Sequence, residues 1–438
     1  MPVRFDPPSG TRDFLAAELE AREAAFGKIK GVFARYGFEP LQTPAFERLE
    51  VLSGKYGDEG DKLIFKILRR GEHEASGEAD MALRYDMTVP LARVAAAYGS
   101  QLPAPYKRYT IGPVWRADRP GKGRFREFTQ CDLDTLGSSS PLADAEVLCA
   151  INETLTELGI DSFTMLLNSR LALSGLLAAF GVPAEIGPAV LITLDKLDKL
   201  RPAEVIKELS ERGLAEVTAD ALVEALTAPD ATERVRTALK SNDEGASGLE
   251  QIDQLLALVR SQVPADRIVF TPRLVRGLSY YTGAIWEVAA EGGGGSLGGG
   301  GRYDHLIEAL GGPDVPATGG SLGVERILSL LADDAAGPRA RLDVAVAVLG
   351  DEFAEASFGF ATAARAAGAR ASAYLGASGK LGRQLKWASD AGARFCLIYG
   401  RSEQAEGTVT VRDMITGEQV AVPSGELTEY LSARLAHA

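Results

Sequence analysis

Cysteine and histidine are scarce in this 438-residue chain, which has three of each. The cysteines lie far apart and include no CxxC pair, so they form neither a zinc cluster nor a disulfide framework, and they suit a reducing compartment. His73, His305 and His437 are too few for a histidine-based triad or a multi-histidine metal site. We therefore expect no metal held by the protein itself and no histidine chemistry in catalysis.

Long apolar runs are also missing. No stretch approaches the roughly 20 uninterrupted apolar residues that a membrane helix needs, and the start MPVRFDPPSGTRDF has no apolar run behind a basic end. We expect a cytoplasmic protein with no membrane contact. The net charge of -13 argues against non-specific coating of nucleic acid, but not against a local basic patch that binds phosphate.

The length predicts two or three domains, and the patterns along the chain divide it further. Residues 1–168 mix a long helix (from Asp13 to about Arg35) with strand-like runs, and residues 169–266 are helical throughout. Strand character returns in residues 267–334, so a helical insertion interrupts an antiparallel-sheet domain. Strands alternate with helices in residues 335–438, which predicts a small α/β domain with a mixed sheet. The fold class is therefore α+β.

Positive charge gathers at one hairpin of this acidic chain. KRYTIGPVW and REFTQCDLDTLG read as two strands joined by the loop ADRPGKGRF, and residues 107–127 hold seven Lys or Arg against two acids. Alternation along the return strand places four side chains on the same sheet surface as Arg116, namely Phe128, Gln130, Asp132 and Asp134. Such a floor suits a ligand with anionic and cationic groups, such as a nucleotide beside an amino acid. The alternative is a solvated, charged tip.

Two further arginines are candidates for a polyphosphate partner. Arg276 in TPRLVRGLSYYTG lies between apolar residues, where an arginine needs an anionic partner. Tyrosines such as Tyr280 and Tyr281 are more often half-buried packing residues than ligand contacts. Arg326 in GGSLGVERIL falls near the start of a predicted helix. Because a triphosphate needs several cationic partners, these residues and Arg116 can serve one ligand.

Two segments stay open on residue patterns alone. Asp86 in LRYDMTVP can cap the following helix, or it can hold a ligand ammonium group. The glycine-rich stretch 291–304 can be a flexible turn, or it can permit close approach of the backbone to a ligand. A helix is expected directly after it, over RYDHLIEALGG.

The ordered set TPAFE, LRYDMTVP, WRADRPGKGRFREF, LVRGLSYYTG, GGGGRYD and GGSLGVERIL resembles the histidyl-tRNA synthetase family of class II aminoacyl-tRNA synthetases. KLGRQLKWASDAGARFCLIYG resembles the anticodon-binding domain of that group. The resemblance implies a class II antiparallel sheet flanked by helices, and a homodimer formed partly through TPAFE. It also implies a ligase that converts ATP and histidine to histidyl-adenylate and pyrophosphate, then transfers histidine to the 3′ end of tRNA(His).

The resemblance implies roles residue by residue. For ATP, brought in with Mg²⁺, it implies Arg116 on the α-phosphate and the carboxylate, Arg326 on the γ-phosphate, Phe128 under adenine, Arg124 as a phosphate support, and Arg276 on the α-phosphate. Arg116, Arg276 and Arg326 are thus the catalytic set. For histidine it implies Asp86, Thr88, Arg116, Gln130, Asp134, Arg276, Tyr280 and Tyr281. For tRNA it implies Arg119 and Lys122 at the hairpin tip, and Lys380, Arg383 and Lys386 in the C-terminal domain, where Lys380, Arg383, Lys386, Arg394 and Arg401 stand against the single acid Asp390.

One departure and one rival reading accompany the resemblance. The family has an acidic residue before YY where this chain has Ser279, which puts histidine affinity or adenylate geometry in question. The rival is a synthetase-like paralogue that no longer aminoacylates and serves as a regulatory subunit of ATP phosphoribosyltransferase. Such paralogues usually lose the arginine at the Arg276 position and the C-terminal domain, and this chain keeps both.

Overall fold

The computed structural model describes residues 5–71, 76–121, 123–198, 200–275, 280–291, 295–331, 341–377 and 379–435, apart from the side chains of Asp58 and Glu59. The chain forms two compact units, Met1–Asp334 (unit 1) and Ala335–Ala438 (unit 2). Unit 1 contains an eight-stranded and a three-stranded sheet, and unit 2 contains a five-stranded sheet. Each unit has its own hydrophobic core.

The eight-stranded sheet at the centre of unit 1 has the order β1-β5-β6-β11-β10-β9-β7-β8. Its inner pairs are antiparallel, and only the edge strands β1 and β8 pair in parallel with their neighbours. This sheet, flanked by helices, confirms the predicted α+β class. The strands span Glu39–Pro40 (β1), Tyr106–Trp115 (β5), Glu127–Leu136 (β6), Phe163–Ser169 (β7), Ile268–Phe270 (β8), Ala284–Ala290 (β9), Ser296–Arg302 (β10) and Ala317–Gly323 (β11).

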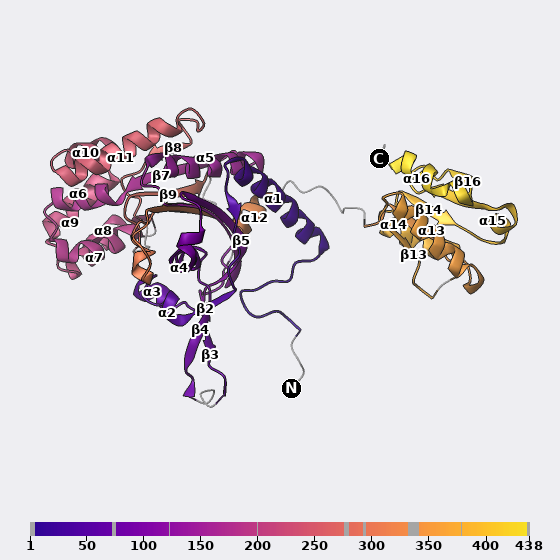
Figure 1. Ribbon diagram of the computed structural model, residues 1–438. Coiled ribbons are helices and arrows are strands. Elements are labelled where there is room, and N and C mark those ends of the chain that lie inside the picture. The colour runs from indigo at the N-terminus through magenta and orange to yellow at the C-terminus, as the bar shows by residue number, and fades with distance from the viewer. Residues whose placement is uncertain are drawn as a thin grey trace. The chain divides into compact units, whose positions relative to one another are not determined.

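The two faces of β6 have different surroundings. Strands β5 and β6 form the predicted hairpin, with Arg108 opposite Asp134 and Thr110 opposite Asp132. Figure 1 shows α4 (Thr88–Tyr98) on the hollow side of the sheet, and α1 (Ala16–Arg35) and α5 (Pro141–Glu157) on the other side. On that other side Arg22 of α1 donates to Thr129 Oγ1. Alternating side chains therefore face either this helical layer or the hollow.

Glycines fill the middle of β10 and β11. Of the glycine-rich stretch, Gly298–Gly301 lie inside β10, and Gly292–Gly294 lie outside the described residues. A Cβ on Gly320 would lie 2.8 Å from Ile151 Cδ1 of α5, and a Cβ on Gly301 would lie 2.8 Å from the Tyr281 ring. The glycines of these strands therefore allow close packing on both faces, and the flexible-turn reading does not hold for Gly298–Gly301.

A three-stranded sheet with the order β2-β4-β3 extends from the body of unit 1 (Figure 1). β3 and β4 pair antiparallel and are among the strand-like runs of residues 1–168. The segment after β4 turns into α4, which begins at Thr88. The bounds are Phe46–Arg48 (β2), Leu49–Leu52 (α2), Gly57–Asp61 (α3), Lys66–Leu68 (β3) and Ala79–Leu83 (β4).

Helices occupy the chain between β7 and β8, and no strand occurs there among the described residues. α6 and α11 approach closely because Gly248 lies against the backbone of Ala172 and Gly245 against Gly175. Among the described residues, no helix is both long and apolar enough to cross a bilayer. The bounds are Arg170–Ala179 (α6), Gly187–Leu194 (α7), Pro202–Glu211 (α8), Glu216–Thr227 (α9), Ala231–Leu239 (α10) and Asp243–Val259 (α11).

The expected helix over RYDHLIEALGG is wrong. Tyr303 follows β10, and only a short 3₁₀ turn, Glu308–Leu310, forms before Gly311 adopts a positive φ of 81°. Side chains hold this segment in place of helical hydrogen bonds: Asp304 Oδ1 accepts from Ala317 N at 3.0 Å, and Arg302 donates to Asp144 at 2.6 Å. A regular helix begins further on, at α12 (Val324–Leu331).

Unit 2 has the predicted mixed sheet, in the order β13-β12-β14-β15-β16. β12 pairs in parallel with β13 and β14, and β15 pairs antiparallel with β14 and β16. Apolar side chains of α13 and α16 cover one face, and those of α14 cover the other. The bounds are Val344–Val346 (β12), Ala354–Ala366 (α13), Ala371–Ala373 (β13), Leu381–Asp390 (α14), Phe395–Ile398 (β14), Arg401–Glu406 (α15), Thr408–Asp413 (β15), Gln419–Pro423 (β16) and Leu427–Leu435 (α16).

Candidate active site

The hollow side of β6 carries a row of polar side chains that is almost fully buried. Gln130 is 8% exposed, and Asp132 and Asp134 are each 2% exposed. We call Phe128, Gln130, Asp132 and Asp134 the polar face of β6. Strand alternation therefore brings these four residues to one surface, as the sequence predicts.

Arg116 lies at one end of the polar face. Its Nε donates to the Tyr85 carbonyl oxygen at 3.1 Å. Its guanidinium carbon lies 4.3 Å from the centre of the Tyr85 ring and 5.2 Å from that of Phe128. The two rings stabilise the cation by cation–π interaction and hold it next to the floor. A half-buried, oriented guanidinium of this kind can bind a phosphate with two hydrogen bonds.

Asp134 lies at the other end and has two partners. It accepts a hydrogen bond from the Tyr303 hydroxyl. Arg108 Nη2 approaches Asp134 Oδ2 to 2.8 Å, although the two atoms are not aligned for a hydrogen bond. Burial raises the pKa of the Asp134 carboxyl, and the Arg108 cation and the Tyr303 hydroxyl oppose that rise. The positive charge of Arg108 thus balances this acid.

Asp86 is buried at the start of α4, across the hollow. Its Oδ1 accepts from Val89 N at 3.0 Å and from the Tyr56 hydroxyl at 3.2 Å. Asp86 therefore does cap the first turn of the helix, as one of its two readings proposed. Burial raises the pKa of its carboxyl, and the Arg116 cation is among the groups that lower it.

Several buried polar atoms on this side have no hydrogen-bond partner among the described residues. The acceptors are Gln130 Oε1, Asp132 Oδ1 and Asp134 Oδ2, and the donors are Nε and Nη1 of Arg108. Buried polar atoms are usually paired, because an unpaired one costs about 1–3 kcal/mol. The three acceptors lie at alternate positions of one strand, so a ligand rich in N–H groups can satisfy them together.

Gly319 of β11 leaves room beside this row. It pairs with Asp134, and an added Cβ would overlap Asp134 Oδ1. Two positions further along β11, Ser321 Oγ accepts from Gln130 Nε2 at 2.8 Å and fixes the orientation of that amide. The open acceptor Gln130 Oε1 is therefore held in place by its own amide nitrogen.

Aromatic side chains enclose the Asp134 end. Tyr280 packs edge-on against Tyr281 at 4.9 Å and against Tyr303 at 5.9 Å between ring centres. The Tyr280 hydroxyl is hydrogen-bonded to Thr88, the first residue of α4. Burial raises the pKa of the Tyr280 hydroxyl well above its ordinary value, so it stays neutral. Thr88 and Tyr281 thus lie next to Tyr280, at the Asp134 end of the polar face.

Arg326 and Arg124 lie in different settings. Arg326, the third residue of α12, donates from Nη1 to the Ser296 carbonyl oxygen at 2.6 Å, at the start of β10. Its neighbour Glu325 is anchored by Arg22 at 2.7 Å and accepts from Thr129 N at 2.9 Å, which ties α12 to β6. Arg124 is 62% exposed at the hairpin tip, where it pairs with Asp118 at 2.7 Å.

Some expected residues lie elsewhere. Arg276, Ser279 and Lys122 are outside the described residues, and Arg119 is exposed in the hairpin loop. Lys380, Arg383 and Lys386 lie at α14 of unit 2. The basic residues of unit 2 do not face a single acid, as the sequence suggested. Lys386 pairs with Asp390 at 3.3 Å, but Arg394 pairs with Asp413 at 2.6 Å, and Arg401 lies 4.0 Å from Glu352.

Sequence reasoning missed Arg108, Tyr303 and Tyr56 as parts of the site. Alternation along KRYTIGPVW could have indicated Arg108, because it lies on the same face of the strand as Arg116. Pairing of the hairpin then places Arg108 opposite Asp134. Tyr303 and Tyr56 come from distant segments that only the tertiary fold brings to Asp134 and Asp86. No local pattern indicates those contacts.

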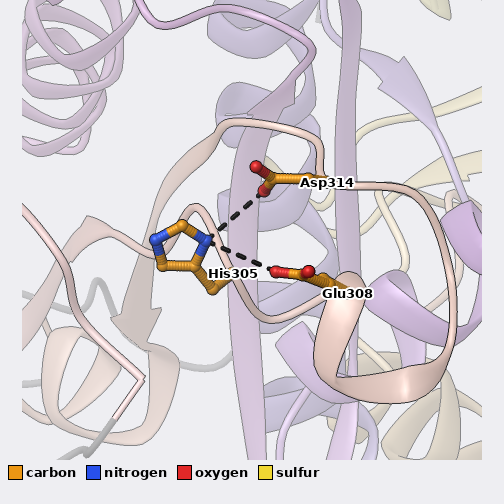
Figure 2. A group of neighbouring side chains, drawn as sticks. All are labelled: His305, Glu308 and Asp314. Atoms are coloured by element: carbon orange, nitrogen blue, oxygen red, sulfur yellow. Dashed lines mark ion pairs between the residues drawn. The ribbon is translucent and has the colours of Figure 1, made fainter.

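Figure 2 shows a separate cluster of His305, Glu308 and Asp314. His305 Nδ1 lies 3.4 Å from Asp314 and 3.7 Å from Glu308, and all three side chains are at least 60% exposed. Three ligand atoms of this kind could hold a metal ion. Exposed pairs of this type contribute little to stability, and in the part of the chain that the structure describes no unpaired buried group lies beside them.

Comparisons with known proteins agree with the geometry. The family model "Histidyl-tRNA synthetase" matches residues 10–327, and the model "Anticodon binding domain" matches residues 343–434. A histidine–tRNA ligase of Gloeobacter violaceus is 39% identical, covering 97% of this chain and 98% of that protein. One of Paracoccus denitrificans is 38% identical, covering 95% and 92%.

Solved structures give the same picture. A crystal structure of histidyl-tRNA synthetase from Nostoc sp. superposes with a TM-score of 0.77 at 29% identity, covering 99% of this chain and all of that one. A structure from Bacillus halodurans, described as an ATP phosphoribosyltransferase regulatory subunit or histidyl-tRNA synthetase, has a TM-score of 0.75 over 92% of this chain and all of that one. Its 21% identity is evidence of a shared fold alone.

Proposed function

The chain belongs to the histidyl-tRNA synthetase family, and we propose that its site on β6 performs the reaction of a histidine–tRNA ligase. A carboxylate oxygen of histidine attacks the α-phosphorus of ATP, the bond to the β-phosphate breaks, and pyrophosphate leaves. The 3′-terminal hydroxyl of tRNA(His) then attacks the carbonyl carbon of histidyl-adenylate, and AMP leaves. Neither step needs a protein nucleophile, so positioning and charge stabilisation carry the catalysis.

One observation carries this assignment: a ring-flanked arginine and a row of unpaired buried acceptors share one strand face. The arginine end suits phosphate and carboxylate, and the acceptor end suits an ammonium group and an imidazole N–H. The histidine side chain can supply such a donor to Asp134, beside the Tyr303 hydroxyl. Buried acceptors that stay unpaired with the wrong substrate can lower kcat/KM for that substrate by a factor of about 10⁴–10⁵.

For ATP we assign Arg116 to the α-phosphate and to the attacking carboxylate, with Phe128 stacked on adenine. Arg326 takes the γ-phosphate, held by Ser296 and by the anchored Glu325 beside it. To bind a phosphate, Arg124 has to give up its ion pair with Asp118. Arg276 completes the catalytic set with Arg116 and Arg326. Mg²⁺ enters with ATP as part of that substrate.

For histidine we assign Asp86, Gln130 and Asp134 to the ammonium and imidazole groups, with Arg116 and Arg276 on the carboxylate. Thr88, Tyr280 and Tyr281 close the pocket, and the Thr88–Tyr280 hydrogen bond supports that wall. Burial raises the pKa of Asp134, whereas Arg108 and Tyr303 favour its charged form. Its carboxylate can then accept from an imidazole nitrogen.

For tRNA we assign the anticodon stem to residues 335–438, with Lys380, Arg383 and Lys386 on its phosphates, and Arg119 and Lys122 to the acceptor end. Residues 1–168 and 267–334 form the catalytic core, and residues 169–266 form the helical insertion. The protein acts as a cytoplasmic homodimer that pairs partly through TPAFE. The exposed side chain of Phe46 in that segment supports a role in pairing.

Amino-acid-dependent exchange of ATP and pyrophosphate tests the function directly. Purified protein with Mg²⁺ is assayed against each of the twenty amino acids, and exchange is expected with histidine alone. Charging of tRNA(His) transcripts follows as the second step. Exchange with another amino acid instead would overturn the assignment.

The regulatory reading has a distinct outcome in the same assay. A regulatory subunit would bind histidine without exchange, and it would have no use for an anticodon-binding domain. The match to that domain over residues 343–434 favours the ligase.

A further inference from the structure

The three buried acids around the hollow differ in what they contact. Asp86 Oδ1 accepts from Val89 N and Tyr56, and Asp134 is held by Tyr303 and balanced by Arg108. Asp132 Oδ1 has no hydrogen-bond partner among the described residues, although Asp132 is 2% exposed. Asp132 is hydrogen-bonded to Ser321 and attracted by the Arg108 cation, but its Oδ1 still offers an open acceptor.

The cations near Asp132 are already engaged. Arg108 faces Asp134 at 2.8 Å and donates to the Met87 carbonyl oxygen at 3.0 Å. Arg84 donates to the carbonyl oxygens of Pro113 and Thr43, each at 2.9 Å. A buried carboxylate next to committed cations still lacks a positive partner of its own. Burial raises the pKa of Asp132 to about 7, and the neighbouring Asp134 adds to that rise.

We propose that Asp132 binds the α-ammonium group of the amino-acid substrate, together with Gln130 Oε1. This inference rests on the proposed function and adds a residue to it. The α-ammonium is fully charged at neutral pH, whereas an imidazole, with a pKa near 6.5, is mostly neutral there. Asp132 lies between Gln130 and Asp134 on the polar face, so the ammonium sits between the carboxylate-binding Arg116 end and the imidazole-binding Asp134 end.

The decisive comparison uses histidine and imidazolepropionate, which is histidine without its α-ammonium group. Binding of each to the full-length protein is measured by calorimetry at pH 8, for wild type, Asp132→Asn, Asp132→Glu and Asp161→Asn. In Asp132→Asn we expect histidine to bind about 10- to 100-fold more weakly, since a hydrogen bond to a charged group is worth about 1.5–3 kcal/mol. Imidazolepropionate should bind within about twofold of wild type.

The other variants make the result specific. Asp132→Glu keeps the charge and should keep most of the preference for histidine. Asp161 is an exposed acid paired with Arg267, so Asp161→Asn should bind both ligands as wild type does. Equal weakening of both ligands in Asp132→Asn would overturn the proposal, because Asp132 would then serve the imidazole or the scaffold. Unchanged histidine binding would overturn it as well.

The readout separates this proposal from the proposed function. Calorimetry reports the ammonium contact even if wild-type protein shows no exchange of ATP and pyrophosphate with histidine. Absence of exchange would count against the ligase alone, and loss of the histidine preference in Asp132→Asn would still support the contact.

Discussion

The interiors of the two units differ in the charge that they bury. Among the described residues, unit 2 buries two polar side chains, Ser357 and Gln384, and no charged one. Gln384 is satisfied at both ends of its amide by the backbone of Val348. The described part of unit 1 buries ten charged side chains, namely Arg22, Glu47, Arg84, Asp86, Arg108, Asp132, Asp134, Asp144, Arg302 and Glu325.

Burying charge costs free energy unless partners compensate it. Some of these charges compensate one another, as in the pair of Arg302 with Asp144 and that of Arg22 with Glu325. The polar face of β6 differs because its acceptors stay open. Unit 1 therefore gives up stability to form a site for small ligands. The charged side chains described in unit 2 are at least partly exposed, so their contacts are weak and salt-dependent.

The strongest test of this contrast is the loss of one oriented charge in unit 1. Arg116→Gln should lower histidine-dependent exchange of ATP and pyrophosphate by about 10²–10³, in line with removal of one preorganised donor to a developing charge. Arg401→Gln removes a guanidinium that is 89% exposed in unit 2 and should leave exchange unchanged. Exchange in Arg116→Gln within about threefold of wild type would remove Arg116 from the catalytic set.

Glycine substitutions should also have opposite effects in the two units. Gly319→Ala places a methyl group on Asp134 Oδ1 and should cost about 1–3 kcal/mol of stability by overpacking, with weaker histidine binding. Gly359 lies inside α13 with open space around its Cβ position, so Gly359→Ala should stabilise unit 2 by about 0.5–1 kcal/mol. Chemical unfolding monitored in each variant checks both signs. A stabilised Gly319→Ala would contradict the close packing of β11 on Asp134.

The pH dependence of stability tests the burial of Asp132. The folded pKa of Asp132, about 7, exceeds the unfolded value of about 3.9, so the folded state binds a proton that the unfolded state releases. Between these two pKa values, each unit of rising pH lowers the free energy of unfolding by up to about 1.4 kcal/mol. Asp132→Asn does not lose this free energy. The ligand-free variant should therefore become more stable relative to wild type as the pH rises from 4 to 7.

Denaturant unfolding of the ligand-free proteins at pH 5 and pH 8 measures that gain. Asp134→Asn is the matched control, since it leaves the Arg108 charge without its acid and should destabilise the protein at pH 8. Arg108, Asp134, Asp86 and Ser321 all influence the Asp132 carboxyl. If Asp132→Asn were less stable than wild type at pH 8, Arg108 and Ser321 would outweigh the cost of burying the Asp132 charge.

The smallest expected effect concerns the surface of unit 2. Arg383→Gln should weaken binding of tRNA(His) by a few fold and lower the slope of log affinity against log salt by about one. Exchange of ATP and pyrophosphate without tRNA should be unaffected. Glu429→Gln, a change in α16 that carries the opposite sign, serves as the control for net charge. An unchanged salt slope in Arg383→Gln would remove this residue from the tRNA surface.

Much of this arrangement was predictable from local pattern. The alternation of REFTQCDLD, the basic loop before it and the unbroken helical periods between β7 and β8 each reflect a short-range preference that the structure follows. The helix expected at RYDHLIEALGG failed because Arg302 and Asp304 bind Asp144 and Ala317 N, which are far away in sequence or in a neighbouring strand. Local propensity loses when side chains find stronger tertiary partners.

The sequence alone thus determined which residues could form a strand face, where positive charge gathers and to which family the motifs are similar. Only the tertiary structure decided which oxygens of the three acids stay open as acceptors, because that depends on Tyr56, Tyr303 and Arg108 arriving from separate segments. The physical reason is that strand alternation is set by neighbouring backbone geometry, whereas the charge state and pairing of a buried carboxyl depend on every group packed around it.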